Sequence, residues 1–170
     1  MNCYVLAGGR SRRMGRSKSE LFLDRVIEAA RPVFDDVIVV DRMFEGPHED
    51  EGPVFGIRAA LQHAQHGRCF ILAVDYPLIT PEVLRYLRDR GGVPVWREKP
   101  QPLCAVYDAA MLPRIESRIA ARRFDVGGLL EDVAVIEESD LRARFAGEPL
   151  LNVNTPEDLE EFHERVLASR

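Results

Sequence analysis

A glycine-rich stretch near the start of the chain carries a dense cluster of cations. The segment VLAGGRSRRMGRSK, residues 5–18, holds two adjacent glycines, four arginines and a lysine. Glycine adopts positive φ easily, so backbone N–H groups in such a loop can converge on an anion. Arginine and lysine side chains then clamp phosphate oxygens by charge-assisted hydrogen bonds. The stretch predicts a loop that binds a nucleoside triphosphate; the alternative is a solvated basic turn without a ligand.

Two familiar phosphate-binding loops do not fit this stretch. A Walker A loop requires G-x-x-x-x-G-K-[ST], but Gly15 is followed by Arg16 and Ser17 before Lys18. A dinucleotide fingerprint requires G-x-G-x-x-G, which GGRSRRMG does not provide. A different kind of nucleotide loop is therefore expected.

A single carboxylate follows the apolar run CFILAV in the segment LAVDYPLIT. In open α/β sheets, ligands bind beyond the carboxyl ends of the strands, where Asp75 would lie. Mg²⁺ accompanies phosphate substrates and prefers carboxylate oxygens. Asp75 is therefore the candidate metal ligand, and the alternative is a carboxylate that only stabilises a turn.

Two asparagines near the end of the chain form a second polar group, in LLNVNTPEDL. Asn152 and Asn154 alternate with Val153, so an extended backbone would point both amides to one side. Thr155 and Asp158 have the spacing of a helix N-cap and its capping-box partner. We interpret the asparagines as functional and Thr155 as structural.

Short apolar runs and helical patterns alternate along the chain and would position these residues. This order predicts an α/β domain with three layers, a Rossmann-like α/β/α arrangement around a mostly parallel mixed sheet. Strands are expected at 2–7, 35–41, 69–75, 92–96, 101–107 and 133–138, and helices at 21–34, 54–65, 80–90, 109–121 and 155–168. The 170 residues suit a single domain, 1–170.

Composition excludes several classes of protein. The net charge of −5 and the pI of about 5.4 disfavour a nucleic-acid partner. Cys3, Cys69 and Cys104 lie in or beside apolar runs and are expected to be reduced, buried thiols. No apolar run is long enough for a membrane span and no signal peptide precedes the first strand, so we expect a cytoplasmic protein that binds no membrane.

The loop sequence L-A-G-G-x-S-x-R-M-G-x-x-K resembles the signature of the molybdenum cofactor guanylyltransferases. These are small nucleotidyltransferases of the nucleotide-diphospho-sugar transferase fold. Related nucleotidyltransferases usually read L-A-A-G-x-G-x-R-M, so the doubled glycine and the serine favour the guanylyl branch. The resemblance implies Arg13, Lys18 and Asp75 as catalytic residues. It implies nucleotide binding by Leu6, Ala7, Gly8, Gly9, Arg13, Gly15, Lys18 and Asp75.

Three other segments carry the same resemblance. GPVFGIRAAL is similar to the family's G-P-L-x-G-I, which implies a loop over the base and ribose that includes Gly52 and an acidic residue. Asp50 is our choice within the acidic run 49–51. The segment NVNTPEDL matches the family almost residue for residue and implies that Asn152 and Asn154 support the metal or acceptor site. The run QPLCAVY is similar to the family's P-L-x-A-x-Y and is expected to be framework.

The chain departs from the family pattern in two places. The Gly-x-Pro turn that usually follows the lysine is missing, so the chain passes almost directly into a helix after Lys18. Phe55 stands where a small residue is usual and could narrow the base pocket or stack on the base.

The resemblance implies transfer of GMP from GTP to molybdopterin, with Mg²⁺ as cofactor and pyrophosphate as product. Proteins that deliver or accept the molybdenum cofactor would be further partners, and the enzyme is expected to be a monomer. Two alternatives stay open. One is cytidylyl transfer to molybdopterin, or nucleotidyl transfer to another small phosphate. The other is a nucleotide-binding protein without catalysis.

Overall fold

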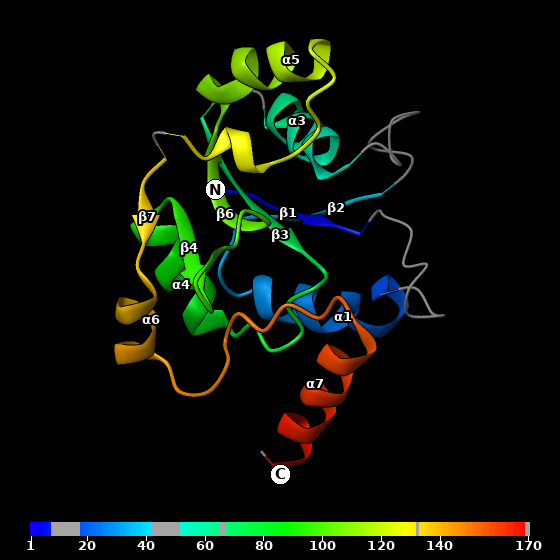
Figure 1. Cartoon of the computed structure of the whole chain (residues 1–170), viewed down its shortest axis with the longest axis vertical. Helices are drawn as coiled ribbons and strands as arrows, with labels where there is room; N and C mark the ends of the chain where they lie inside the picture. Colours follow the sequence, from blue (N-terminus) through cyan, green and yellow to red (C-terminus); the bar gives the residue numbers. More distant parts are fainter. Residues whose placement is uncertain (8–17, 42–51, 65–66, 132, 169–170) are drawn as a thin grey trace.

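The computed structural model describes residues 1–7, 18–41, 52–64, 67–131 and 133–168 (Figure 1). Its central sheet has the order β2-β1-β3-β6, formed by β1 (Cys3–Leu6), β2 (Val37–Val40), β3 (Arg68–Ala73) and β6 (Cys104–Asp108). β1 runs parallel to both β2 and β3, whereas β6 is antiparallel to β3. The carboxyl ends of β1, β2 and β3 therefore meet at one edge of the sheet.

Helices cover both faces of this sheet (Figure 1). One face packs on α1 (Lys18–Ala30) and α4 (Pro81–Arg90), and the other on α3 (Pro53–His63) and α5 (Leu112–Ala120). The two-residue period of β1 explains this, because Cys3 and Val5 join the first core while Tyr4 and Leu6 join the second. The three-layer α/β/α arrangement expected from the sequence is confirmed.

A second sheet flanks the first, in the order β5-β4-β7. It consists of β4 (Val93–Trp96), β5 (Lys99–Pro100) and β7 (Val135–Ile136), with β4 parallel to β7 and antiparallel to β5. The Val106 N–H donates to the Gly92 carbonyl at 3.4 Å, which joins β6 to the start of β4. The helices α6 (Glu138–Arg144) and α7 (Pro156–Ala168) complete the fold.

Most expected elements are present, with shifted ends. The helix expected at 21–34 is α1, which ends at Ala30 because Pro32 follows and Val33 and Phe34 turn back onto the Ala30 carbonyl. The sequence patterns missed β5 and α6. α6 buries only Leu141 and is too short to show an apolar period.

The three cysteines are free and buried, as expected. Burial raises the pKa of Cys69 to about 12, so its thiol stays protonated and unreactive. None of the helices within the described ranges combines the length and apolarity that a membrane crossing requires.

Arg97 ties the second sheet to the C-terminal part of the chain. Its guanidinium donates to Glu148 at 2.8 Å and to both carboxylate oxygens of Glu161, on α7, at 3.1 and 2.5 Å. The hydrogen bonds from Arg97 lower the pKa of Glu161. Glu148 also accepts from the indole N–H of Trp96 at 3.0 Å. The segment between Glu148 and α7 is thereby held at both ends.

We expect Arg97→Asn to lower the free energy of unfolding by about 1–2 kcal/mol, since it removes several charge-assisted hydrogen bonds. Asparagine tolerates the left-handed backbone of this residue, whose φ is 51°. The loss should shrink as the pH falls through the lowered pKa of Glu161, because the protonated carboxyl no longer pairs. Urea unfolding at several pH values measures both effects.

Glu98→Asn is the matched control, because Glu98 has a φ of 61° in the same turn. Its exposed side chain should be replaceable with a change within about 0.5 kcal/mol. Equal losses in the two variants would contradict the role given to the Arg97 ion pairs.

Candidate functional site

The candidate site lies at the edge where the three parallel strands end. The Ala7 N–H donates to the Val40 carbonyl at 3.0 Å, and the Val74 N–H donates to the Leu6 carbonyl at 3.3 Å. Ala7 and Asp75 therefore leave neighbouring strands at the same edge. This is the position at which open α/β sheets bind ligands.

Most of the predicted phosphate loop lies outside the described residues, namely Gly8, Gly9, Arg13 and Gly15, and so does Asp50. Lys18 is the first residue of α1, so the predicted loop spans the chain between the end of β1 and a helix N-terminus. Leu6 is 6% exposed and packs in the core, so only its backbone is available to a ligand. Ala7 is half-buried.

Gly52 has a conformational reason to be glycine. It is the N-cap residue of α3 and has a φ of 120°, which L side chains rarely adopt. A Cβ atom at this position would lie 3.4 Å from the carbonyl oxygen of Phe124. The backbone turn into α3 therefore requires glycine, and contact with a nucleoside stays a prediction.

The position of Phe55 bears on the expectation that its ring stacks on the base. Phe55 belongs to α3, and its side chain is 1% exposed and packs in the core, with its ring 5.3 Å from the ring of Phe124. The guanidinium of Arg58 covers it at 5.3 Å. A ring enclosed in this way is not available to stack on a base, so the stacking alternative is wrong. Narrowing of the base pocket by Phe55 stays a prediction.

Asp75 lies two residues beyond the end of β3 and is half-buried. Its backbone carbonyl accepts a hydrogen bond of 2.8 Å from the N–H of Val153. This bond brings the asparagine segment, far away in the sequence, against the strand edge. The structure thus places together the two groups that the sequence singled out separately.

The asparagines lie as their alternation predicted. Leu151 and Val153 are buried at 1% and 0% exposed, while Asn152 is half-buried and Asn154 is exposed. The Asn154 amide Nδ2 donates to Asn152 Oδ1 at 2.5 Å, so the two side chains meet on the same side of the segment. The expectation of a shared direction is confirmed.

The predicted capping box holds the end of this segment. Asp158 Oδ2 accepts from the N–H groups of Asn154 and Thr155, both at 2.8 Å, and the Asp158 N–H donates to Thr155 Oγ1 at 3.2 Å. Thr155 therefore has the structural role predicted for it. The same carboxylate fixes the backbone of Asn154.

Sequence reasoning missed a buried polar pair beneath this edge. Tyr76 is 1% exposed, and its hydroxyl donates to Gln101 Oε1 at 3.1 Å. Burial raises the pKa of Tyr76 well above its ordinary value, with Cys104 and Asp75 adding to the rise, while the polar side chain of Asn152 opposes it. In the sequence, the one sign of this buried pair is the polar Gln101 at the start of the apolar run QPLCAVY, a run expected to be framework.

Among the described residues, no three or more of His, Cys, Asp and Glu gather where they could hold a metal ion. A single carboxylate residue whose backbone bonds to a segment with two amides still offers hard oxygen donors. It suits Mg²⁺, which proteins commonly bind through one or two carboxylates together with substrate phosphates. A preformed thiolate or imidazole metal site is not supported by these residues.

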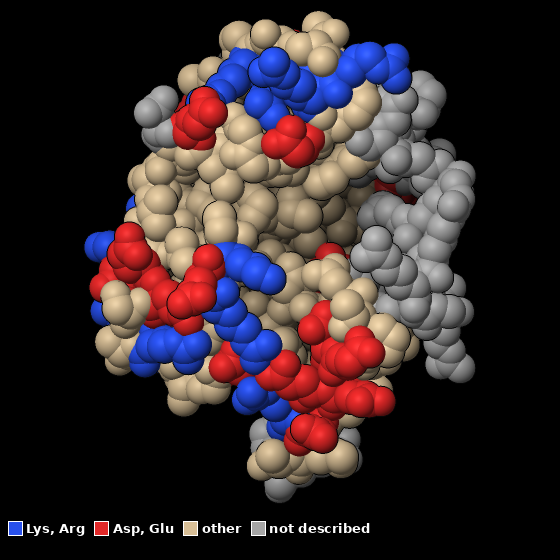
Figure 2. Space-filling model, in the orientation of Figure 1, with Lys and Arg blue, Asp and Glu red and all other residues tan. Residues whose placement is uncertain are grey.

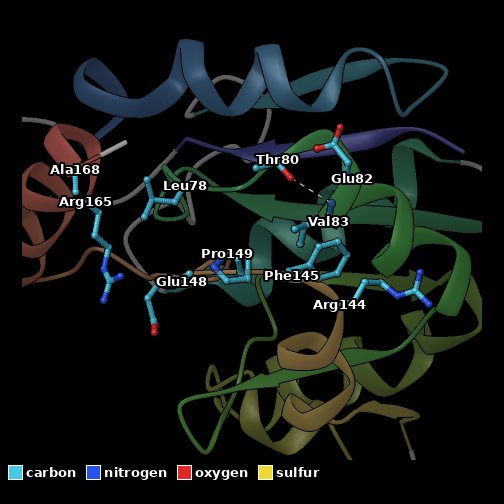
Figure 3. A pocket seen from close by; sticks show the side chains of 12 residues that line it. Leu78, Thr80, Glu82, Val83, Arg144, Phe145, Glu148, Pro149, Arg165 and Ala168 are labelled. Atoms are coloured by element: carbon cyan, nitrogen blue, oxygen red, sulfur yellow. Dashed lines mark hydrogen bonds between the residues drawn. The ribbon is translucent and has the colours of Figure 1, made fainter. Parts of the chain in front are cut away.

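A cavity of about 610 Å³ lies between the start of α4, the segment that follows α6, and α7 (Figure 3). Leu78 lines it from the segment before α4, Thr80 and Val83 line it from the start of α4, and Arg165 lines it from α7. No residue that the sequence predicted for nucleotide or metal binding lines this cavity.

Charged side chains lie around a hollowed, largely uncharged area in Figure 2, with a basic band over α5 and mixed charges below. Two cations of α5 are paired: Arg114 with Glu131 at 2.8 Å and Arg118 with Asp125 at 2.7 Å. These cations are thus partly neutralised by neighbours in the chain.

Comparison with known proteins agrees with this arrangement. A family model described as a MobA-like NTP transferase domain matches residues 3–133. A probable molybdenum cofactor guanylyltransferase from Aquifex aeolicus is 34% identical, over 94% of the chain and 89% of the relative. One from Pelotomaculum thermopropionicum is also 34% identical, over 91% of the chain and 88% of the relative.

A solved structure has the same fold. It is the molybdopterin-guanine dinucleotide biosynthesis protein A from Archaeoglobus fulgidus, with 25% identity, 100% of both chains covered and a TM-score of 0.77. The fold is therefore that of the nucleotide-diphospho-sugar transferases, as expected from the loop signature. With its relatives named molybdenum cofactor guanylyltransferases, the chain belongs to the MobA-like NTP transferase family.

Proposed function

We propose that the protein transfers GMP from GTP to molybdopterin, giving the guanine dinucleotide cofactor and pyrophosphate. The observation that carries this proposal is the meeting of Asp75 with the Asn152–Asn154 segment, joined by the 2.8 Å bond from Val153 to Asp75. It places a carboxylate and amide groups beyond the ends of β1 and β3, in a chain whose relatives are named for this activity.

The phosphates of GTP are proposed to bind the glycine-rich loop. Gly8, Gly9 and Gly15 would bring backbone N–H groups to the phosphates, and the start of α1 would add its positive dipole end. Arg13 and Lys18 would neutralise the charge that develops on the departing pyrophosphate. Gly52 and Asp50 are proposed to face the nucleoside.

Asp75 would hold Mg²⁺, with Asn152 and Asn154 supporting the metal or the acceptor. When bound, the ion supplies electrostatic stabilisation of the charge on the phosphate oxygens. The half-buried position of Asp75 suits this role, because the residue is not fully enclosed at the strand edge. The residues present fit the ion through their hard oxygen donors.

The reaction needs no nucleophile from the protein. An oxygen of the molybdopterin phosphate attacks the α-phosphorus of GTP, and the bond from that phosphorus to the bridging oxygen of the β-phosphate breaks. Pyrophosphate leaves with the electron pair of that bond. The chain's residues contribute by aligning two anionic reactants and offsetting their repulsion.

The nucleotide is tested by thermal shift. GTP with Mg²⁺ should raise the melting temperature more than ATP, CTP or UTP, because the doubled glycine of the loop favours the guanylyl branch. A ligand at about 100 times its Kd adds roughly 2.7 kcal/mol of stability. A larger shift with CTP would assign the protein to cytidylyl transfer instead.

Asp75→Asn tests the proposed metal ligand, since it keeps the size of the side chain and removes its charge. We expect turnover with Mg²⁺ to fall at least about 100-fold, the scale of losing one strong electrostatic contact to a transition state. Binding of GTP without metal should be unchanged or tighter, because a carboxylate near the phosphates has lost its charge.

Asp108→Asn is the matched control. Asp108 ends β6 opposite Arg68, at the other edge of the sheet, and its carboxylate only accepts from the Ala110 N–H at 2.8 Å among the contacts described. This variant should lose a little stability and keep its turnover. Near-normal Mg²⁺-dependent turnover in Asp75→Asn would exclude the proposed metal site.

A further inference from the structure

One carboxylate makes two hydrogen bonds at the point where the asparagine segment meets α7. Asp158 Oδ2 accepts from the backbone N–H of Thr155 and from that of Asn154, both at 2.8 Å. In an ordinary capping box, the carboxylate accepts only from the residue that caps the helix, which is Thr155 here. The bond from Asn154 lies outside the helix, and capping the helix does not require it.

The bond to Asp158 matters for Asn154 because this residue is exposed. Its neighbours Leu151 and Val153 are anchored by burial, at 1% and 0% exposed, and Val153 is also anchored by its bond to the Asp75 carbonyl. Packing contributes little to the position of an exposed residue. The backbone bond therefore sets the point from which the Asn154 side chain extends.

Helix α7 is a firm support for this carboxylate. Phe162 is 6% exposed, and its ring lies 5.2 Å from the ring of Phe22 on α1. Glu161 accepts two hydrogen bonds from Arg97. These contacts attach α7 to the rest of the fold without using its first turn. Removal of the capping carboxylate should therefore release Asn154 without detaching the helix.

We propose that Asp158 is a positioning residue that sets Asn154, and through it Asn152, on the segment bound to the Asp75 turn. The catalytic consequence rests on the proposed function, in which the two asparagines support the metal or the acceptor. Two successive N–H groups are tied to different parts of the fold: that of Val153 to the turn after β3, and that of Asn154 to α7. Asn154 Nδ2 then donates to Asn152 Oδ1 at 2.5 Å, which passes the position on.

Asp158→Ala tests the proposal because it removes both acceptor bonds. The backbone N–H of Asn154 should exchange with solvent at least about 10-fold faster, since it loses its acceptor. We also expect kcat for GMP transfer with Mg²⁺ to fall at least about 10-fold, the scale seen when a residue that orients a site group is lost. The Kd of GTP without metal should stay unchanged, because the predicted phosphate loop is a separate segment.

Thr155→Val is the matched control. It removes the other half of the same capping box, the 3.2 Å bond from the Asp158 N–H to Thr155 Oγ1, and leaves both bonds to the carboxylate. Each variant should lower the melting temperature by roughly 2–4 °C through the weakened cap. Only Asp158→Ala should speed exchange at Asn154 and lower kcat. Equal falls of kcat in the two variants would overturn the proposal in favour of a helix cap alone.

Asp158→Asn separates position from charge. Its amide oxygen can still accept from both N–H groups, but the negative charge is gone. We expect this variant to keep Asn154 protected from exchange and to retain a kcat well above that of Asp158→Ala. A kcat as low as that of Asp158→Ala would assign the effect to the charge of the carboxylate and would overturn the positioning role.

A double-mutant cycle with Asn154→Ala tests whether Asp158 acts through Asn154. In that background, Asp158→Ala should cause little further fall in kcat. Losses that multiply would overturn the proposal, and so would an Asn154 N–H that stays protected in Asp158→Ala. If the wild type transfers no GMP, the proposed function fails, while hydrogen exchange at Asn154 still decides whether Asp158 holds it in place.

Discussion

The hydrogen bond from the Val153 N–H to the Asp75 carbonyl holds the candidate site together. It spans 2.8 Å and joins the turn after β3 to a segment that comes almost at the end of the chain. Other contacts hold the two partners of this bond, Asp75 and Val153, in place. The central sheet fixes Asp75 beside Ala7, while the Arg97 ion pairs and the Asp158 capping box fix the segment that carries the asparagines. Asp75 and the segment that carries two amides are brought together without sharing any secondary-structure element.

The local patterns of the sequence are enough to predict most of this arrangement. Alternation around Val153 predicted that Asn152 and Asn154 share a side, and the spacing of Thr155 and Asp158 predicted the cap; both are confirmed. The strand order and the meeting of Asp75 with Val153 have no such local sign, because they depend on contacts between distant residues. The alternation of strands and helices predicted the α/β class, and the loop signature identified the family and with it the particular fold.

Burial decides the roles of two residues, Phe55 and Gln101, that the sequence patterns did not settle. Phe55 looked available for a base, but a ring that is 1% exposed belongs to the core. The run that begins at Gln101 was expected to be framework. A polar side chain this deeply buried must satisfy its hydrogen bonds, and Gln101 does so with Trp96, Lys99 and Tyr76. Neither environment can be read from neighbouring residues, since both are built by strands and helices from elsewhere in the chain.

The central claim is nucleotidyl transfer at the carboxyl edge of β1 and β3, and GTP labelled with radioactive phosphorus tests it most directly. The protein is incubated with Mg²⁺, molybdopterin and GTP labelled at either the α- or the γ-phosphate. Transfer of GMP predicts that the α-label appears in a pterin dinucleotide, while the γ-label leaves entirely as pyrophosphate. Release of the γ-label as inorganic phosphate, with no α-label joined to the pterin, would contradict the account.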